Sequence, residues 1–297
     1  MKFKRITPSD MPIIWEYLKT ETGRTTDFSY GGVLMWTDYF NYSYAIENET
    51  LFIKGLVEND ISKPAFSLPI GNLSLKDAVD RLKEYCNEEK IPLEFSAIPE
   101  YALKDFLSLN PVITEELTDW GDYLYESRSL ATLAGKKMGK KRNHVHQFIM
   151  HYPEWRYEEL TSNNAKDALL FMDIFEKEGD DSELAKKERE LSRFLITRFI
   201  DGDKVLMGGI LYVGNEVAGY TIGDIKGDTL FIHIEKATRK FLGSYEMINH
   251  QFAKYTINKF PYIIFINRED DAGDPGLRLS KESYHPLQIL KKFNVVF

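Results

Sequence analysis

Three groups of polar residues in this chain have types and spacing that could do chemistry. The first is a basic run within residues 127–153, a stretch that contains no Asp or Glu. Its six cationic residues are Arg128, Lys136, Lys137, Lys140, Lys141 and Arg142. On a helix, Lys137, Lys141 and His144 would stack on one side, an arrangement that suits the binding of phosphate groups. The alternative is a solvated linking helix whose positive face balances an acidic protein.

The same segment carries two glycines and an apolar stripe. Gly135 and Gly139 would let a phosphate approach the backbone closely, because they have no side chain. Val145, Phe148 and residues 149 and 152 recur at helical spacing. This spacing predicts an amphipathic helix whose apolar side packs on a domain.

The second group lies in a polar loop that directly follows a predicted buried strand, residues 262–266. In open α/β sheets, ligands bind at the carboxyl ends of strands, so this position favours a binding site. The candidates in the loop are Asn267, Arg268, Glu269, Asp270 and Arg278. The acids do not follow the order of a calcium-binding loop, and we expect no metal site.

Three further candidates, Lys281, Tyr284 and His285, follow the loop closely. All three could contribute to substrate binding at the same place. As a catalytic base His285 is less favoured, because a lone histidine beside proline is more typical of a hydrogen-bonded turn.

The third group is His233 and Glu235, at the end of a strand predicted over residues 229–234. Strand residues alternate between faces, so the two side chains would share a face and could handle a proton together. The alternative is that Glu235 forms a buried ion pair with Lys236 or Arg239.

The elements that must position these groups form two similar halves. Each half opens with a short strand, cap residues and a helix, at residues 2–18 and again at residues 155–175. We expect an α+β protein with mixed sheets flanked by helices in both halves. The predicted domains are residues 1–127 and 154–297, joined by a basic connecting helix over residues 128–153.

Further elements follow from the hydrophobic pattern and the turn residues. In the first half we predict strands at 51–57 and 65–69, a helix at 75–85, and a hairpin made by 111–117 and 122–126. In the second half we predict a helix at 183–200, a hairpin of 204–213 and 216–225, the strand at 229–234, a helix at 244–258 and the strand at 262–266.

The amino-acid composition excludes several classes of protein. Its 297 residues are 43% hydrophobic and 28% charged, which is typical of a folded globular protein. The net charge of −8 excludes a general polyanion binder, so contact with a nucleic acid must be local, and we expect no DNA partner. The one cysteine, Cys86, excludes an internal disulfide and is predicted to be a buried thiol. No apolar stretch approaches the ~20 residues of a membrane span, and we expect a cytoplasmic protein.

Four runs of residues, in this order along the chain, resemble a known bacterial family. The runs are residues 130–144, 233–237, 266–271 and 277–286. Together they resemble the DUF2156 family, which includes the cytoplasmic catalytic domain of phosphatidylglycerol lysyltransferase. The resemblance implies two tandem acetyltransferase-like (GNAT) folds. It also implies kinship with the Fem-type transferases, which move an amino acid from aminoacyl-tRNA to a peptide or lipid acceptor.

The resemblance implies a function for each group of residues. Aminoacyl-tRNA would be the donor, with no cofactor required, and the acceptor would be an amine or hydroxyl of a lipid headgroup, peptide or small molecule. Glu235 or Glu269, with His233, would act on the acceptor proton, while Arg268 and Arg278 would hold an anionic group. The remaining substrate-binding candidates are Asn267, Asp270, Lys281, Tyr284 and His285. The tRNA phosphates would bind Lys136, Lys137, Lys140, Lys141, Arg142 and His144.

Two other classes of function stay open at this point. An acetyl-CoA-dependent N-acetyltransferase would share the fold, and its pyrophosphate loop would precede a helix. Residues 239–245 keep one glycine of such a loop, Gly243, with altered spacing. A GNAT-fold binding module without catalytic activity is the other class. We expect no membrane-spanning portion ahead of the domain, and a small-molecule, peptide or protein amine is then as open as a lipid.

Overall fold

The computed structural model describes residues 1–177 and 183–297, which divide into two compact units. The first unit, called here the N-terminal unit, contains residues 1–123, 269–275 and 289–297. The second, the C-terminal unit, contains residues 124–268 and 276–288. These units differ from the contiguous ranges expected from the sequence. The difference arises because the last strand of the chain lies within the sheet of the N-terminal unit.

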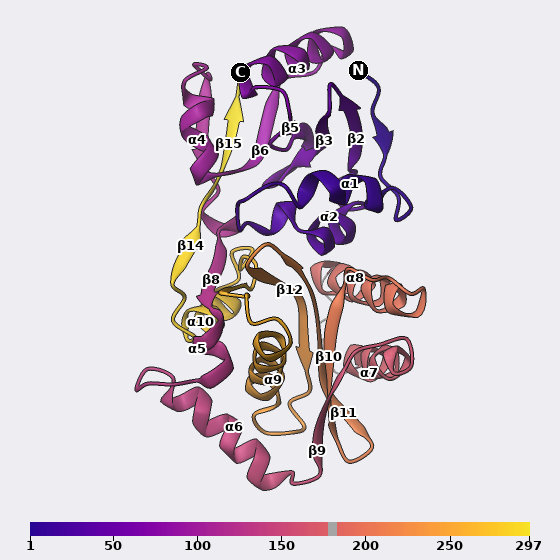
Figure 1. Cartoon of the computed structure of the whole chain (residues 1–297), viewed down its shortest axis with the longest axis vertical. Helices are drawn as coiled ribbons and strands as arrows, with labels where there is room; N and C mark the ends of the chain where they lie inside the picture. The colour runs from indigo at the N-terminus through magenta and orange to yellow at the C-terminus, as the bar shows by residue number, and fades with distance from the viewer. Residues whose placement is uncertain (178–182) are drawn as a thin grey trace. The chain divides into compact units, whose positions relative to one another are not determined.

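The N-terminal unit is built on one mixed sheet (Figure 1). The strand order is β1-β2-β3-β4-β6-β15-β7, and β5 pairs with β3. The strands are β1 (Lys4–Arg5), β2 (Ser43–Glu47), β3 (Thr50–Val57), β4 (Asp60–Phe66), β5 (Ile70–Gly71), β6 (Glu94–Pro99), β7 (Ile113–Glu116) and β15 (Lys292–Val296). The helices are α1 (Met11–Leu18), η1 (Thr26–Phe28), α2 (Tyr30–Trp36), α3 (Leu75–Glu89), α4 (Glu100–Leu107) and η2 (Thr118–Trp120).

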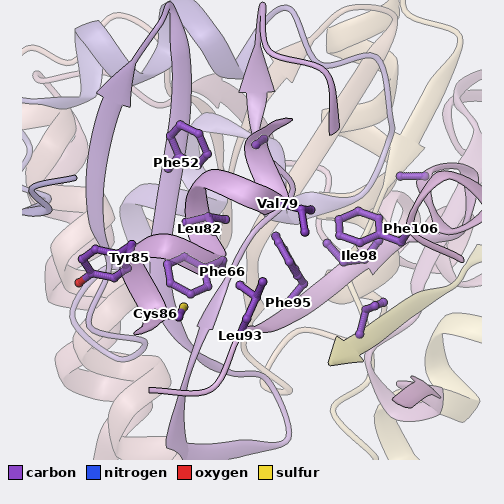
Figure 2. Close-up of a cluster of buried hydrophobic side chains, with 13 residues drawn as sticks. Phe52, Phe66, Val79, Leu82, Tyr85, Cys86, Leu93, Phe95, Ile98 and Phe106 are labelled. Carbon is purple, nitrogen blue, oxygen red and sulfur yellow. The ribbon is translucent and has the colours of Figure 1, made fainter. Parts of the chain in front are cut away.

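Helix α3 shows how the sequence forms this unit. Ser74 caps the helix by accepting a hydrogen bond from the backbone N–H of Asp77 at 3.1 Å. Val79, Leu82 and Cys86 recur at helical spacing and are buried, in one cluster with Phe66 of β4 (Figure 2). Burial of each large apolar side chain contributes roughly 1.5–3 kcal/mol. The predicted buried thiol is confirmed, and burial raises the pKa of Cys86 to about 11.

The C-terminal unit has a second mixed sheet, with the strand order β14-β8-β13-β12-β11-β10-β9. Its strands are β8 (Asp122–Glu126), β9 (Trp155–Glu159), β10 (Met207–Val213), β11 (Glu216–Lys226), β12 (Thr229–Ala237), β13 (Phe265–Asn267) and β14 (Gln288–Leu290). Its helices are α5 (Ser127–Thr132), α6 (Gly139–His151), α7 (Ala165–Lys177), α8 (Glu183–Ile200), α9 (Ser244–Lys259) and α10 (Pro275–Glu282). Helix α9 packs on β11 and β12 and also contacts α5 and α6.

A glycine fixes the approach of α6 to the start of α9. Gly243 precedes α9 with φ of +84°, a conformation that favours glycine. A Cβ at this position would lie 2.5 Å from the backbone oxygen of His144 in α6. The close packing of the two helices therefore explains this glycine.

Two predicted elements were wrong. Residues 111–126 form no hairpin, because β7 pairs with β15 and β8 pairs with β13 in the other sheet. The strand predicted at 262–266 is limited to Phe265–Asn267, and the side chains of Tyr262 and Ile264 are 58% and 54% exposed. The predicted helix at 183–200 and the β10–β11 hairpin are confirmed.

None of the helices among the residues that the structure describes combines the length and apolarity needed to cross a membrane. None of the groups of His, Cys, Asp and Glu formed by these residues is placed to hold a metal ion.

Candidate functional site

An ion pair between Glu235 and Arg268 forms the centre of the candidate site in the C-terminal unit. Arg268 Nη2 donates to Glu235 Oε1 at 2.8 Å, and each side chain is only 11% exposed. Glu235 lies near the end of β12, and Arg268 directly follows β13. The two strands run parallel but pair only over residues 229–231 and 265–267. Both residues lie beyond the paired region, so their side chains can meet between the strand ends.

Asn249 of α9 holds the second oxygen of the same carboxylate. Its Nδ2 donates to Glu235 Oε2 at 2.9 Å, and the asparagine is fully buried. Because a carboxylate only accepts hydrogen bonds, the amide nitrogen must face Glu235 and the amide oxygen must face away.

Two buried atoms around Glu235 have no hydrogen-bond partner among the residues that the structure describes. They are Asn249 Oδ1, an acceptor, and Arg268 Nη1, a donor. A buried polar group left unpaired costs about 1–3 kcal/mol, and native proteins contain few of them. The pair therefore offers one donor and one acceptor to a ligand.

Two tyrosines flank the guanidinium of Arg268. Its central carbon lies 4.7 Å from the ring centroid of Tyr284 and 5.8 Å from that of Tyr125. Burial opposes the charge of Arg268, but Glu235 outweighs this effect and the pKa of Arg268 is raised above its ordinary value. Burial raises the pKa of Tyr125 to about 12 and also raises that of Tyr284. Arg268 therefore stays charged, and both phenols stay protonated at neutral pH.

The backbone around Arg268 is fixed from α10 and β8. Lys281 Nζ donates to the backbone oxygen of Arg268 at 2.6 Å. Tyr125 donates its hydroxyl proton to the backbone oxygen of Lys281 at 2.8 Å. The structure thus brings Lys281 and Tyr284 to Arg268, and their binding of a substrate stays a prediction.

Lys141 connects the basic run to this site. Its Nζ lies 4.1 Å from the ring centroid of Tyr284, the ring that also stacks on Arg268. The same Nζ lies 3.4 Å from Glu246 Oε1. His144 Nδ1 lies 3.0 Å from that same oxygen. Burial lowers the pKa of Lys141 despite the opposing effect of Glu246.

The rest of the basic run divides into structural and exposed residues. Arg142 donates to the backbone oxygens of Leu133 and Gly135 at 2.6 and 3.1 Å, so it fastens the turn before α6. The exposed lysines are Lys136, Lys137 and Lys140. The predicted stacking of Lys137 on Lys141 was wrong, because α6 begins at Gly139.

The two glycines and the apolar stripe of this segment can also be located. A Cβ added at Gly135 or Gly139 would meet nothing within 4 Å, so the backbone there is open to approach. Val145 and Phe148 are buried as predicted, whereas Ile149 is 38% exposed.

His233 pairs with Asp224. Its Nε2 lies 2.5 Å from Asp224 Oδ1 of β11, and both side chains are fully buried. The register between β11 and β12 shifts between Ile222 and Gly223, which is the place opposite His233. This irregularity interrupts the alternation on which the prediction of a shared face rested. The alternative prediction, a buried ion pair of Glu235, is confirmed in kind but not in partner: Glu235 pairs with Arg268, and Lys236 pairs with Glu188.

Two predicted candidates from the polar loop belong to the N-terminal unit. Glu269 Oε1 accepts a hydrogen bond from the Thr26 hydroxyl at 3.1 Å, and its backbone oxygen accepts from the Tyr123 N–H. Asp270 Oδ1 accepts from the backbone N–H of Ala272 at 2.9 Å. Both carboxylates therefore help to hold the loop itself.

The structure also locates the remaining candidates. Asn267 is fully buried within β13, where it pairs with Leu124 and Phe231. Arg278 is partly buried on α10, and His285 is exposed. His285 has a φ of +53°, in agreement with the predicted turn role.

Sequence reasoning missed Asn249 and Glu246, which both lie on α9. Asn249 lies between Ile248 and Phe252 on the buried side of the helix. A polar residue among buried apolar positions was the available signal, since a buried amide needs a specific partner.

The chain thus folds into two mixed sheets flanked by helices, a tandem GNAT-like fold, with an Arg–Glu pair at the strand ends of the second sheet. Residues 20–296 match the family model described as "Phosphatidylglycerol lysyltransferase, C-terminal". The chain belongs to this family, as its sequence runs indicated.

Several solved structures share this fold. A conserved protein of unknown function from Bacteroides thetaiotaomicron is 29% identical, with a TM-score of 0.90 over 100% of this chain and 99% of that one. L-PGS from Bacillus licheniformis is 11% identical, with a TM-score of 0.68 over 99% and 92% of the two chains. FemX is 10% identical, with a TM-score of 0.64 over 100% and 98%. The last two likenesses establish the fold alone.

A curated relative is an uncharacterized protein from Mycoplasmoides gallisepticum. It is 26% identical over 176 residues, which are 59% of this chain. The match spans 55% of that protein, about half of its length.

Proposed function

We propose that this chain transfers an amino acid from aminoacyl-tRNA to an amine or hydroxyl acceptor. The observation that carries the proposal is Nη1 of Arg268, which is buried and has no hydrogen-bond partner within residues 1–177 and 183–297. Acyl transfer passes through a tetrahedral intermediate whose oxygen becomes negative. A preorganised N–H donor at that oxygen stabilises it strongly where water is excluded. Glu235 keeps the guanidinium in position through Nη2 and leaves Nη1 for the substrate.

Glu235 is the proposed base of the reaction. Each of its oxygens accepts one hydrogen bond and retains a second lone pair for the acceptor proton. In this proposal the acceptor proton passes to Glu235 as the new bond to the carbonyl carbon forms. The ester bond to the tRNA ribose then breaks, and the leaving ribose oxygen takes up the proton. An aminoacyl ester is already activated, so alignment supplies much of the remaining catalysis.

The exposed lysines of the basic run are the proposed phosphate-binding residues. Lys136, Lys137 and Lys140 are exposed. Lys141, the next residue in the chain, contacts the ring of Tyr284. Phosphates bound along this segment would place the end of a nucleic acid near Arg268. Cations at an exposed segment give binding that depends steeply on salt.

The fold alone is equally compatible with an acetyl-CoA-dependent reaction, but the glycine that favoured it has another explanation. Gly243 is required by the close approach of the His144 backbone. The proposal therefore takes aminoacyl-tRNA as the donor, and acetyl-CoA enters as the competing donor of the test.

The test is a transfer assay with two donors. Purified protein is mixed with charged tRNA or with acetyl-CoA, and with phosphatidylglycerol vesicles, amino acids or short peptides as acceptors. The proposal expects an amino acid to leave the tRNA and appear on one acceptor class. Acetylation of an acceptor, with no transfer from tRNA, would overturn it.

A further inference from the structure

The free amide oxygen of Asn249 is the feature that the proposed reaction leaves unused. The asparagine is fully buried, and its amide nitrogen is committed to Glu235 Oε2 at 2.9 Å. Its oxygen has no partner among the residues described. An acceptor in this position requires a ligand that donates an N–H or O–H bond.

The charge of Glu235 determines which charge is favoured on the group that donates to Asn249. Glu235 lies between Asn249 and Arg268 and supplies a negative charge to both sides. Arg268 binds the other oxygen of the same carboxylate through Nη2, and its Nη1 is a second donor. A group bound here therefore offers an acceptor to Arg268 and a donor, preferably a cationic one, to Asn249.

An α-aminoacyl group has this combination on adjacent carbon atoms. Its carbonyl oxygen accepts, and its protonated α-amine donates. We infer that Asn249 recognises the free α-amine of the donor while Arg268 holds its carbonyl oxygen. This inference rests on the proposed function and adds that the site rejects donors whose α-amine is acylated.

Rejection follows from the chemistry of the blocked amine. An N-acetylated amine carries no positive charge, has one N–H instead of three, and adds bulk beside a fully buried side chain. A site built to pair with a polar group discriminates strongly against an analogue that lacks it, because its own buried groups stay unpaired.

The experiment compares three forms of one tRNA preparation. Bulk tRNA is charged with the full set of amino acids, and a portion is then acetylated on its α-amines. A second portion is deacylated. Equilibrium binding of each form is measured with the wild-type chain and with Asn249→Leu, whose side chain has a similar size. Asn258→Leu is the control, because Asn258 is an exposed residue of the same helix. Asn249→Ala replaces the leucine variant if that one does not fold.

The inference predicts a specific pattern of affinities. The wild type and Asn258→Leu should bind the free-amine form about 10-fold more tightly than the acetylated form. In Asn249→Leu the two affinities should become equal, while binding of deacylated tRNA should not change. A general structural defect would weaken all three forms together, and that result would contradict the inference.

Two other outcomes separate this inference from the proposed function. Equal, tight binding of the free and acetylated forms by the wild type would overturn the role of Asn249 and leave aminoacyl transfer standing. Failure to bind any form of tRNA would overturn the proposed function, and the inference with it.

Discussion

Arg268 uses one terminal nitrogen of its guanidinium to hold Glu235, at 2.8 Å, and the other is buried with no hydrogen-bond partner in the described part of the chain. This asymmetry distinguishes the pair from a structural salt bridge. A structural role is best served when both nitrogens are paired, since each unpaired buried donor lowers stability. The pair is therefore better understood as a positioned donor for a substrate oxygen.

Arg268→Lys tests this role directly. Lysine keeps the positive charge but cannot hold Glu235 and a substrate oxygen in the same fixed geometry. We expect kcat for aminoacyl transfer to fall by about 10²–10³, with a smaller change in KM. Steady-state kinetics measure the effect, and Arg239→Lys, at an exposed position, is the control. An unchanged kcat would contradict the role of Arg268 at the developing oxyanion.

Lys141 should make tRNA binding sensitive to pH. Burial lowers the pKa of Lys141, so this side chain loses its charge at a lower pH than exposed lysines do. Binding of uncharged tRNA should weaken as pH rises through the range just below the ordinary lysine pKa of 10.5, by up to ~10-fold for one phosphate contact. Arginine stays charged throughout this range, so Lys141→Arg should remove most of the decline. The same decline in the variant would show that Lys141 is not its cause.

A buried cation holds two carboxylates in the N-terminal unit. Lys292 Nζ lies 2.9 Å from both Asp27 Oδ2 and Asp122 Oδ1, and only 1% of its side chain is exposed. Burial opposes its charge, but Asp122 and Asp27 outweigh burial and raise the pKa of Lys292 well above its ordinary value. Lys292→Met would leave the two carboxylates together without compensation. We expect a loss of about 3–5 kcal/mol in the free energy of unfolding at pH 7, measured in urea.

The neighbouring lysine provides a matched control. Lys291 pairs with Glu116, but its side chain is 46% exposed, so Lys291→Met should cost less than ~1 kcal/mol. Burial raises the pKa of Asp27 above its ordinary value. The contribution of such a group to stability is lost as pH rises through the folded-state pKa, so Lys292→Met should regain stability as pH falls below neutral. Equal losses in the two variants would contradict the account of this cluster.

Asp10 should give the N-terminal unit a sensitivity to acid. Hydrogen bonds from Lys4 and Thr7 lower the pKa of Asp10 to about 2 from an ordinary 3.8. Its contribution to stability is complete above the unfolded pKa and is lost as pH falls through about 2. Asp10→Asn should cost roughly 1–2 kcal/mol at neutral pH, because Lys4 is exposed and partly screened by solvent. It should also flatten the profile of stability below pH ~4.

The comparison for Asp10 is Asp38→Asn. Asp38 pairs with Arg5, but its side chain is 83% exposed. Its replacement should change the free energy of unfolding by less than ~0.5 kcal/mol at any pH tested. A comparable loss in both variants would contradict the special role of Asp10.

Local patterns in the sequence correctly predicted helices, and strands that pair with a strand nearby in the sequence. The helix at 183–200 and the hairpin of β10 and β11 follow from helical spacing and from a turn at Gly214. The predicted hairpin at 111–126 failed because β7 pairs with β15, which is distant in the sequence. Pairing between strands that are distant in the sequence depends on how remote segments pack. The local spacing of residues carries no information about that packing.

The site was predicted in part for the same reason. Arg268 was found because it follows a strand, and Glu235 because it lies near the end of one. Their ion pair, and the hydrogen bond from Asn249 on another element, join three remote segments and could not be derived from spacing. The proposed partnership of His233 and Glu235 failed because the irregular register of β12 interrupts its alternation.

The most direct test of the central claim is equilibrium binding of charged tRNA and of acetyl-CoA across a series of salt concentrations. The account predicts submicromolar tRNA binding that weakens steeply with salt, and no comparable binding of acetyl-CoA. In the triple variant Lys136→Ala, Lys137→Ala and Lys140→Ala, the slope of log affinity against log salt should fall by about 2–3. A variant with alanine at three exposed lysines of the N-terminal unit, Lys2, Lys63 and Lys76, should keep the wild-type slope. Binding of acetyl-CoA with no binding of tRNA would contradict the account.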